Sequence, residues 1–332
     1  MNMLNRNYMR DSFLPRVRRV HCDDGSNGVF TEQMTTAVLA EVFRKRYEAH
    51  KFVAGGLMPL DTSPDAGALA VGWDDAGYTS DGGDGFVSDT ATDVPTVDVD
   101  LERKSNPAHT LATAYTYSDT MIDTARMSGN YDPIVDKASR AREDWERKLN
   151  NAIRFGAPDK NIPGFYRHPD INVVPAATGT WGAATAAQIV ADFSTPVDQM
   201  MQDTDGVGAP TAAIFDIPTW RRISVLQNSV ASDISVLRYL QLTHPSITTW
   251  GWDAGLLGQG DGGTGAGSTY TGGQNAVMIY RNDRQTIRGL VPKGMTPKGP
   301  QENDLAYKVL FWGRFAGLAV PRPREVVRLE GV

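Results

Sequence analysis

The sequence has a single cysteine, Cys22, in 332 residues, so no disulfide can form within the chain. A lone thiol fits a reducing compartment such as the cytosol. Its neighbour His21 does not make a ligand cluster, so we interpret Cys22 as structural. No apolar run approaches the roughly 18 residues that a membrane-spanning helix needs. The first residues lack the apolar core of a signal peptide. We therefore expect a soluble protein, made in the cytoplasm, that does not enter a membrane.

Motifs for catalysis and cofactor binding are also missing. The sequence contains no G-x-x-x-x-G-K-[ST] loop, no H-E-x-x-H and no G-x-S-x-G elbow. Gly258, Gly260 and Gly263 match G-x-G-x-x-G, but Gly-rich sequence continues on both sides, so we interpret the match as chance. The histidines lie far apart without metal-ligand spacing, at His21, His50, His109, His168 and His244. We predict no enzyme, no cofactor and no metal site.

Basic residues are absent between positions 61 and 102, where Gly, Asp, Ser and Thr dominate. This segment ends in TVDVDLE, in which Val97, Val99 and Leu101 alternate with carboxylates, the period of a strand with one wet face. We predict a long hairpin that projects from the body, and its exposed edges favour an intermolecular role. Its carboxylates lack the regular spacing of a calcium loop, so a solvated acidic hairpin is favoured over an ion site at Asp81, Asp84, Asp89 and Asp93.

The stretch from 132 to 155 has the strongest helical pattern in the chain. Apolar residues recur at steps of three and four, at Ile134, Ala138, Ala141, Trp145, Leu149, Ala152 and Ile153. The charged face carries three pairs spaced by four residues, Asp136 with Arg140, Glu143 with Arg147 and Asp144 with Lys148. At about 1.5 Å per residue such a helix crosses a whole domain. We predict a long helix with one face against a sheet.

The remaining segments predict an α+β fold with non-local strands. We expect helices at 31–52, 118–126, 185–201, 218–226 and 236–242, with Pro196 kinking or splitting the third. Turns and a small hairpin are expected at 156–174. Strands are expected at 111–117, 212–215, 247–252, 276–280, 307–315, 318–320 and 325–329, with a Gly-rich loop at 255–273.

In this order the chain resembles the major capsid proteins of tailed bacteriophages, the Hong Kong 97-type fold. Residues 1–30 resemble its N-terminal arm, 31–68 a helix region, 69–104 the extended E-loop hairpin and 132–155 the spine helix of a peripheral domain at 105–184. PTAAIFDIPTWRRISVLQNSVASDISVLRYL, within 185–290, is similar to the axial domain. GRFAGLAVPRPREVVRLEGV, within 291–332, is similar to the closing part of the peripheral domain.

The resemblance implies a subunit that self-assembles into pentamers and hexamers of an icosahedral or prolate head enclosing double-stranded DNA. It implies a virion location, assembly in the host cytoplasm, a separate scaffolding protein, a portal and possible decoration proteins. The formal net charge of -6 favours weak, sequence-independent DNA contacts. Two alternatives remain open: an encapsulin-like compartment shell, and a soluble α+β enzyme with a Gly-rich lid.

Opposite charges suggest which surfaces meet between subunits. The N-terminal arm is basic, at Arg6, Arg10, Arg16, Arg18 and Arg19. The hairpin is acidic, at Asp81, Asp84, Asp89, Asp98, Asp100 and Glu102. We expect the arm and hairpin of neighbouring subunits to pair. Some members of this fold crosslink subunits through a hairpin lysine, but here only Lys104 lies near the hairpin, at its base, so we predict no covalent ladder in denaturing gels.

Overall fold

The computed structural model describes residues 50–80, 96–128, 133–229, 232–257 and 275–332. The chain divides into two compact units, Met1–Arg46 and Tyr47–Val332, and all described residues belong to the second. The basic arm, Cys22, His21, most of the helix expected at 31–52, the hairpin tip and most of the Gly-rich loop lie outside the described residues. Among the helices that are described, none has the length and hydropathy to cross a membrane.

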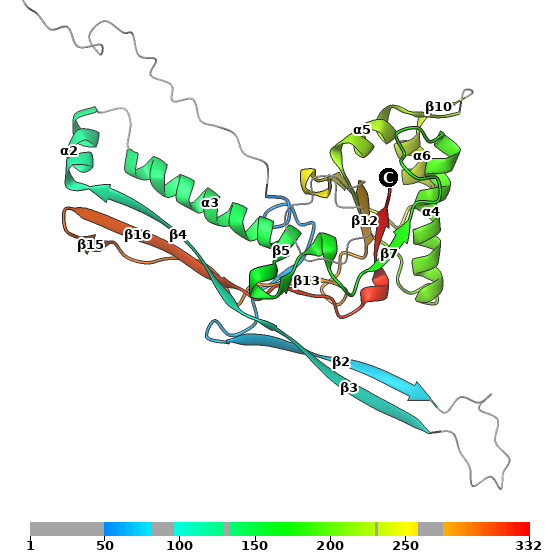
Figure 1. Cartoon of the computed structure of the whole chain (residues 1–332), viewed down its shortest axis with the longest axis horizontal. Helices are drawn as coiled ribbons and strands as arrows, with labels where there is room; N and C mark the ends of the chain where they lie inside the picture. The colour runs from blue at the N-terminus through cyan, green and yellow to red at the C-terminus, as the bar shows by residue number, and fades with distance from the viewer. Residues whose placement is uncertain (1–49, 81–95, 129–132, 230–231, 258–274) are drawn as a thin grey trace, which may run out of the picture. The chain divides into compact units, whose positions relative to one another are not determined.

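The predicted projecting hairpin is confirmed. Strands β2 (Ala70–Ser80) and β3 (Val97–Pro107) pair with each other in an antiparallel, two-stranded sheet, and β3 runs three residues beyond the expected end. After Ala108 the chain continues as β4 (His109–Ser118), which belongs to a different sheet. The hairpin and the body of the molecule are therefore joined by one continuous run of extended chain (Figure 1).

A four-stranded sheet carries the long helix on one face. β4 pairs along its whole length with β16 (Ala306–Phe315), which also pairs with β14 (Lys293–Pro297) and β15 (Gln301–Asn303). Helix α2 (Asp119–Ser128) leads into α3 (Pro133–Phe155), which lies along β4 and β16 (Figure 1). The predicted apolar face of this helix is confirmed, because Ala141, Trp145, Leu149 and Ile153 are buried.

A five-stranded sheet forms the centre of the second half. Its order is β11 (Thr249–Trp252), β8 (Ala212–Phe215), β12 (Ala276–Tyr280), β18 (Val326–Glu330) and β7 (Asn172–Pro175). Alternate residues of β8 and β12 enter two different hydrophobic clusters: Ile214 and Met278 join one, whereas Phe215 and Ile279 join the other. Because successive side chains of a strand point to opposite faces, this sheet is covered on both sides.

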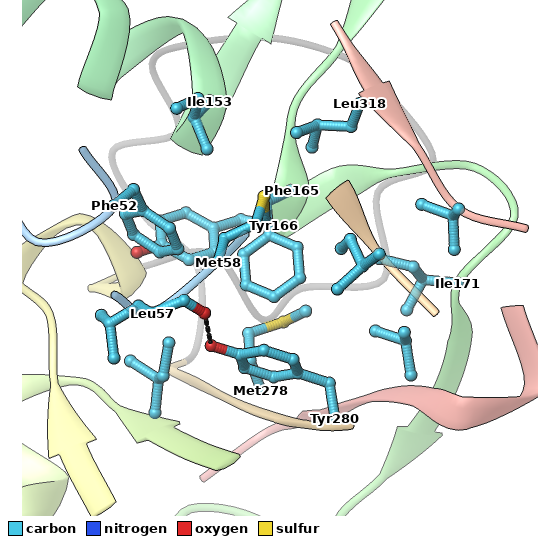
Figure 2. Close-up of a cluster of buried hydrophobic side chains, with 14 of the residues drawn as sticks. Phe52, Leu57, Met58, Ile153, Phe165, Tyr166, Ile171, Met278, Tyr280 and Leu318 are labelled. Carbon is cyan, nitrogen blue, oxygen red and sulfur yellow. Dashed lines mark hydrogen bonds between the residues drawn. The ribbon is translucent and has the colours of Figure 1, made fainter. Parts of the chain in front are cut away.

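Helices α4 (Ala186–Asp203), α5 (Ile217–Val225) and α6 (Val236–Thr243) supply the cluster on one face. The cluster on the other face joins the end of α3 to residues 52–58 and to the turn at 165–166 (Figure 2). There the Tyr280 hydroxyl donates a hydrogen bond of 2.5 Å to the Leu57 carbonyl, and burial raises the pKa of this tyrosine. Ile153 of α3 therefore shares a core with the five-stranded sheet.

Short elements complete the fold. β5 (Gly156–Ala157) and β6 (Ile162–Pro163) form the predicted small hairpin around the 3-10 turn Pro158–Lys160. β13 (Arg288–Leu290) pairs with β1 (Leu60–Asp61) and β17 (Leu318–Ala319). β9 (Gln227–Ser229) pairs with β10 (Ser232–Ser235). Further 3-10 turns are Phe165–Arg167, Ala254–Leu256 and Pro323–Glu325.

The structure corrects the expected positions of two strands. Residues 172–175 were expected among turns and a small hairpin, but as β7 they pair in parallel with β18 at the edge of the five-stranded sheet. β18 itself, expected with the peripheral part, also pairs with β12. A strand of five buried residues needs neighbours on both edges and cover on both faces, and the five-stranded sheet supplies both.

Helix α4 is not split at Pro196, contrary to one of the expected outcomes. Proline in a helix interior costs roughly 3 kcal/mol because it removes one hydrogen bond and crowds the preceding turn. Phe193, Val197 and Met200 are buried on the same side of the helix, and burial of each side chain contributes roughly 1.5–3 kcal/mol. A capping box between Thr185 and Gln188 secures the start. The free energy from side-chain burial and capping together exceeds the free-energy cost of placing proline inside the helix.

Candidate assembly interface

Both faces of the β2–β3 hairpin are exposed. Directly opposite residues of an antiparallel pair share a face, so Val99 and Leu101 lie on one side together with Ala76, which is opposite Leu101. Val97, Val99 and Leu101 are 66%, 59% and 72% exposed. The sequence predicted one solvent-exposed face, whereas the structure shows two, because no second layer among the described residues covers this two-stranded sheet. We call Val97, Val99 and Leu101 the apolar face of the hairpin.

The opposite side of β3 carries Asp98, Asp100 and Glu102, all exposed. Asp75 lies directly opposite Glu102, which places two carboxylates side by side. Lys104 Nζ lies 3.6 Å from Asp75. In the part of the chain that the structure describes, no cation forms an ion pair with Asp98, Asp100 or Glu102. This acidic face is therefore available to a basic partner.

The base of the hairpin, by contrast, is anchored to the body. Val71 is buried in a small cluster with Leu290, Ala316 and Ala319. The side-chain amide of Asn106 donates a hydrogen bond of 2.7 Å to the Leu318 carbonyl. Arg314 donates to the carbonyls of Ala66 and Ala108, at 2.9 and 3.2 Å. The base of the hairpin is thus held by the body, whereas Val97, Val99 and Leu101 are left exposed by the described residues.

The charged face of α3 partly contacts β4, which the sequence did not indicate. Of the expected pairs, Lys148 with Asp144 is confirmed at 2.9 Å, and Asp144 also accepts a hydrogen bond of 3.1 Å from Thr113 on β4. Partial burial raises the pKa of Asp144, but hydrogen bonds from Lys148, Arg147 and Thr113 lower it more. Arg147 pairs with this same carboxylate, and Arg140 pairs with Glu143 at 2.9 Å. Asp144 therefore stabilises both the helix and its contact with the sheet.

A buried polar network fixes the end of α3 to the five-stranded sheet. Asp253, just after β11, accepts hydrogen bonds from Arg154 of α3 and from the Tyr166 hydroxyl. All three residues are buried, and burial followed by the nearby Asp253 charge raises the pKa of Tyr166 well above its usual value. Arg328 of β18 donates a hydrogen bond of 2.6 Å to the Tyr166 carbonyl. The long helix and the five-stranded sheet are thus held together by this network.

A sequence comparison decides the family. The model of the family described as Major capsid protein matches residues 83–332, three quarters of the chain. The chain belongs to the major capsid protein family. Similar solved structures show the fold. The capsid of Myoviridae phage XM1 matches with a TM-score of 0.75 and 15% identity, and the match covers 92% of this chain and 100% of that one.

Other solved structures match at similar identity. A structure from Mycobacterium phage Adephagia has a TM-score of 0.60 and 12% identity over 93% of this chain and 98% of that one. A virus-like particle from Pyrococcus furiosus has a TM-score of 0.51 and 12% identity over 82% and 90%. No curated protein matches the chain. The capsid subunit has the Hong Kong 97-type fold, as its resemblance predicted, and its family indicates a structural role in a shell.

The capsid subunit's predicted interface residues fall into two groups. Asp98, Asp100 and Glu102 are exposed on β3. The other predicted interface residues lie outside the described residues: Arg6, Arg10, Arg16, Arg18, Arg19, Asp81, Asp84 and Asp89. The pairing of arm and hairpin remains a prediction. Sequence reasoning missed the exposed apolar face, because alternation of apolar and charged residues shows which side chains share a face but not whether another element covers that face.

Candidate residues for chemistry remain scattered. The histidines occupy different places in the fold: His109 begins β4, His168 follows the Phe165–Arg167 turn, His244 follows α6 and His50 precedes β1. The described residues contain no group of three potential metal ligands. His244 Nε2 lies 3.2 Å from Ser194 Oγ, and burial lowers the pKa of this histidine. The Gly258, Gly260 and Gly263 match lies outside the described residues.

Proposed function

We propose that each capsid subunit binds a neighbouring subunit through its β2–β3 hairpin. The observation that carries this proposal is the exposed apolar face of Val97, Val99 and Leu101 on an anchored hairpin. Burial of each side chain contributes roughly 1.5–3 kcal/mol, so covering this face on a neighbour favours association. Many such modest contacts add up in a closed shell.

The proposed assembly consists of pentamers and hexamers that form an icosahedral or prolate phage head around double-stranded DNA. It forms in the host cytoplasm with a separate scaffolding protein, a portal and possible decoration proteins. The basic N-terminal arm of one subunit pairs with the acidic face of the hairpin of another subunit. In support, Asp98 and Asp100 have no cationic partner among the described residues. Contacts with DNA are weak and sequence-independent. The subunit works without catalysis, cofactor or metal.

An encapsulin-like compartment shell is the second candidate, because the fold is shared with a virus-like particle. The two candidates use the hairpin in the same way and differ in cargo. Nucleic acid inside purified particles supports the phage head, and an enclosed enzyme supports the compartment.

The test of the hairpin replaces its apolar face. In the variant Val97→Ser, Val99→Ser, Leu101→Ser, we expect a folded subunit that no longer forms shells, because exposed positions contribute little to the stability of the monomer. Sedimentation and electron microscopy measure assembly, and circular dichroism measures folding. The control is Val207→Ser, since Val207 is 70% exposed but lies outside the hairpin. Normal assembly of the triple variant, or equal loss in the control, would contradict the proposal.

A further inference from the structure

An open groove of about 1,100 Å³ lies beside helix α5. Ile217, Pro218, Val225 and Leu226 provide its apolar part, and the residues of β9 form one border. Val225 is 75% exposed and Ile217 is 43% exposed. Exposed apolar surface of this kind marks a site where a partner binds. The groove is separate from the β2–β3 hairpin.

The groove carries positive charge. Its lining includes Arg221 and Arg222 but no carboxylate. Arg222 is held by a hydrogen bond of 2.9 Å to the Ala184 carbonyl, whereas Arg221 is exposed. Among the residues that the structure describes, no carboxylate lies within ion-pair distance of Arg221. The partner should therefore present apolar side chains and at least one carboxylate.

Exposed apolar side chains and a carboxylate also occur on the neighbouring elements β10 and α6 of the same subunit, where Arg238 is exposed as well. Tyr239 and Leu242 are three residues apart on α6, so they share a face, and both are exposed. Asp233, just before the helix, is exposed, and no cation pairs with it in the described ranges. We call Asp233, Tyr239 and Leu242 the α6 surface. Helices α5 and α6 both belong to the layer over one face of the five-stranded sheet (Figure 1).

We propose that the groove of one subunit binds the α6 surface of the next, with Arg221 beside Asp233 and Val225 beside Leu242. A symmetric contact of groove with groove would bring two Arg221 side chains together, so the charges favour a head-to-tail contact. A head-to-tail contact repeats around an axis and closes into a ring when its rotation allows. This inference rests on the proposed shell function and names one contact within its rings.

Single-cysteine variants test this geometry. With Cys22→Ser as background, Val225→Cys and Leu242→Cys are prepared separately, mixed during assembly and oxidised. We expect covalent dimers in the mixture and none in either variant alone, because residue 225 meets residue 242 of another copy. Shells without dimers in the mixture would overturn the inference and leave the shell function standing. Dimers of Val225→Cys alone would indicate a symmetric contact and would also overturn it.

A charge exchange provides the second test. Arg221→Glu and Asp233→Arg should each lower the yield of shells, because each places like charges across the contact. The double variant Arg221→Glu, Asp233→Arg should restore the yield, whereas a merely structural role of either side chain would give no restoration. Failure of restoration with folded subunits would count against the contact. If the unaltered chain forms no shells, the shell function and this inference both fail.

Discussion

At the scale of single residues, Asp253 has the largest expected effect on folding. Its carboxylate accepts hydrogen bonds from Arg154 and Tyr166 in the buried network that joins α3 to the five-stranded sheet. Asp253→Ala leaves a buried guanidinium without this carboxylate, which costs about 3–5 kcal/mol. We expect urea unfolding of unassembled subunits to show this loss. The control Asp98→Ala removes an exposed carboxylate and should stay within about 0.5 kcal/mol, so equal losses in both variants would refute the role of the network.

His168 predicts a dependence of stability on pH. It is buried, and its Nδ1 accepts a hydrogen bond of 3.3 Å from the Asp170 N–H, which requires an unprotonated nitrogen. Burial lowers the pKa of His168, the Lys104 charge lowers it further, and the Asp170 charge opposes this. The unfolded chain therefore takes up the proton first as pH falls below about 6.5.

The free energy of unfolding should accordingly decrease from pH 7 towards pH 5, until the folded histidine is also protonated. His168→Gln should reduce this decrease, and urea unfolding at several pH values measures it. Burial also lowers the pKa of His244, so His244 contributes to the pH dependence of unfolding equally in the unaltered protein and in His168→Gln. Identical pH profiles for the two proteins would show that His168 does not contribute.

At the scale of elements, the end of α3 depends on Gly156. Its φ of +74° is left-handed, and an added Cβ would lie 2.3 Å from the Ile162 carbonyl oxygen, across the β5–β6 hairpin. Gly179 has nearly the same φ, +73°, but open space around it. Gly179→Ala should cost only the backbone strain, roughly 1–2 kcal/mol. Gly156→Ala should cost clearly more in thermal or urea unfolding, and equal costs would mean that the close approach is unimportant.

Elements with a strong local period could be predicted from the sequence. The stripe that includes Trp145 and Leu149 predicted α3 to within one residue at its start, and the alternation around Val99 predicted β3. Local periodicity reports which face of an element is apolar, but not which element covers it. The sequence therefore predicted neither the pairing of β7 with β18 nor the exposed second face of the hairpin.

The polar contacts were less predictable than the elements. Asp253 meets Arg154 across 99 residues of sequence, and no motif marks either one. The groove beside α5 also depends on which side of that helix packs against the sheet. By contrast, the carboxylates Asp98, Asp100 and Glu102 were predicted to be exposed because they alternate with valine and leucine, and the structure confirms their exposure.

At the scale of the whole molecule, the described residues form a packed body and a hairpin whose apolar face none of them covers. The body is held by hydrophobic clusters on both faces of the five-stranded sheet and by the buried network at Asp253. The described residues leave the apolar side chains of the hairpin exposed. Burial of this apolar face on a neighbouring subunit, as proposed above, would lower the free energy of the assembled state, which is the property that a shell subunit needs.

The most direct test of the hairpin's role is electron microscopy with sedimentation of the unaltered chain and of Val97→Ser, Val99→Ser, Leu101→Ser. Both proteins should be expressed alone and together with their neighbouring viral genes. The account predicts closed shells, or rings of five and six subunits, from the unaltered chain and folded, unassembled subunits from the variant. Only monomers or dimers from the unaltered chain, even with scaffolding and portal partners present, would contradict it.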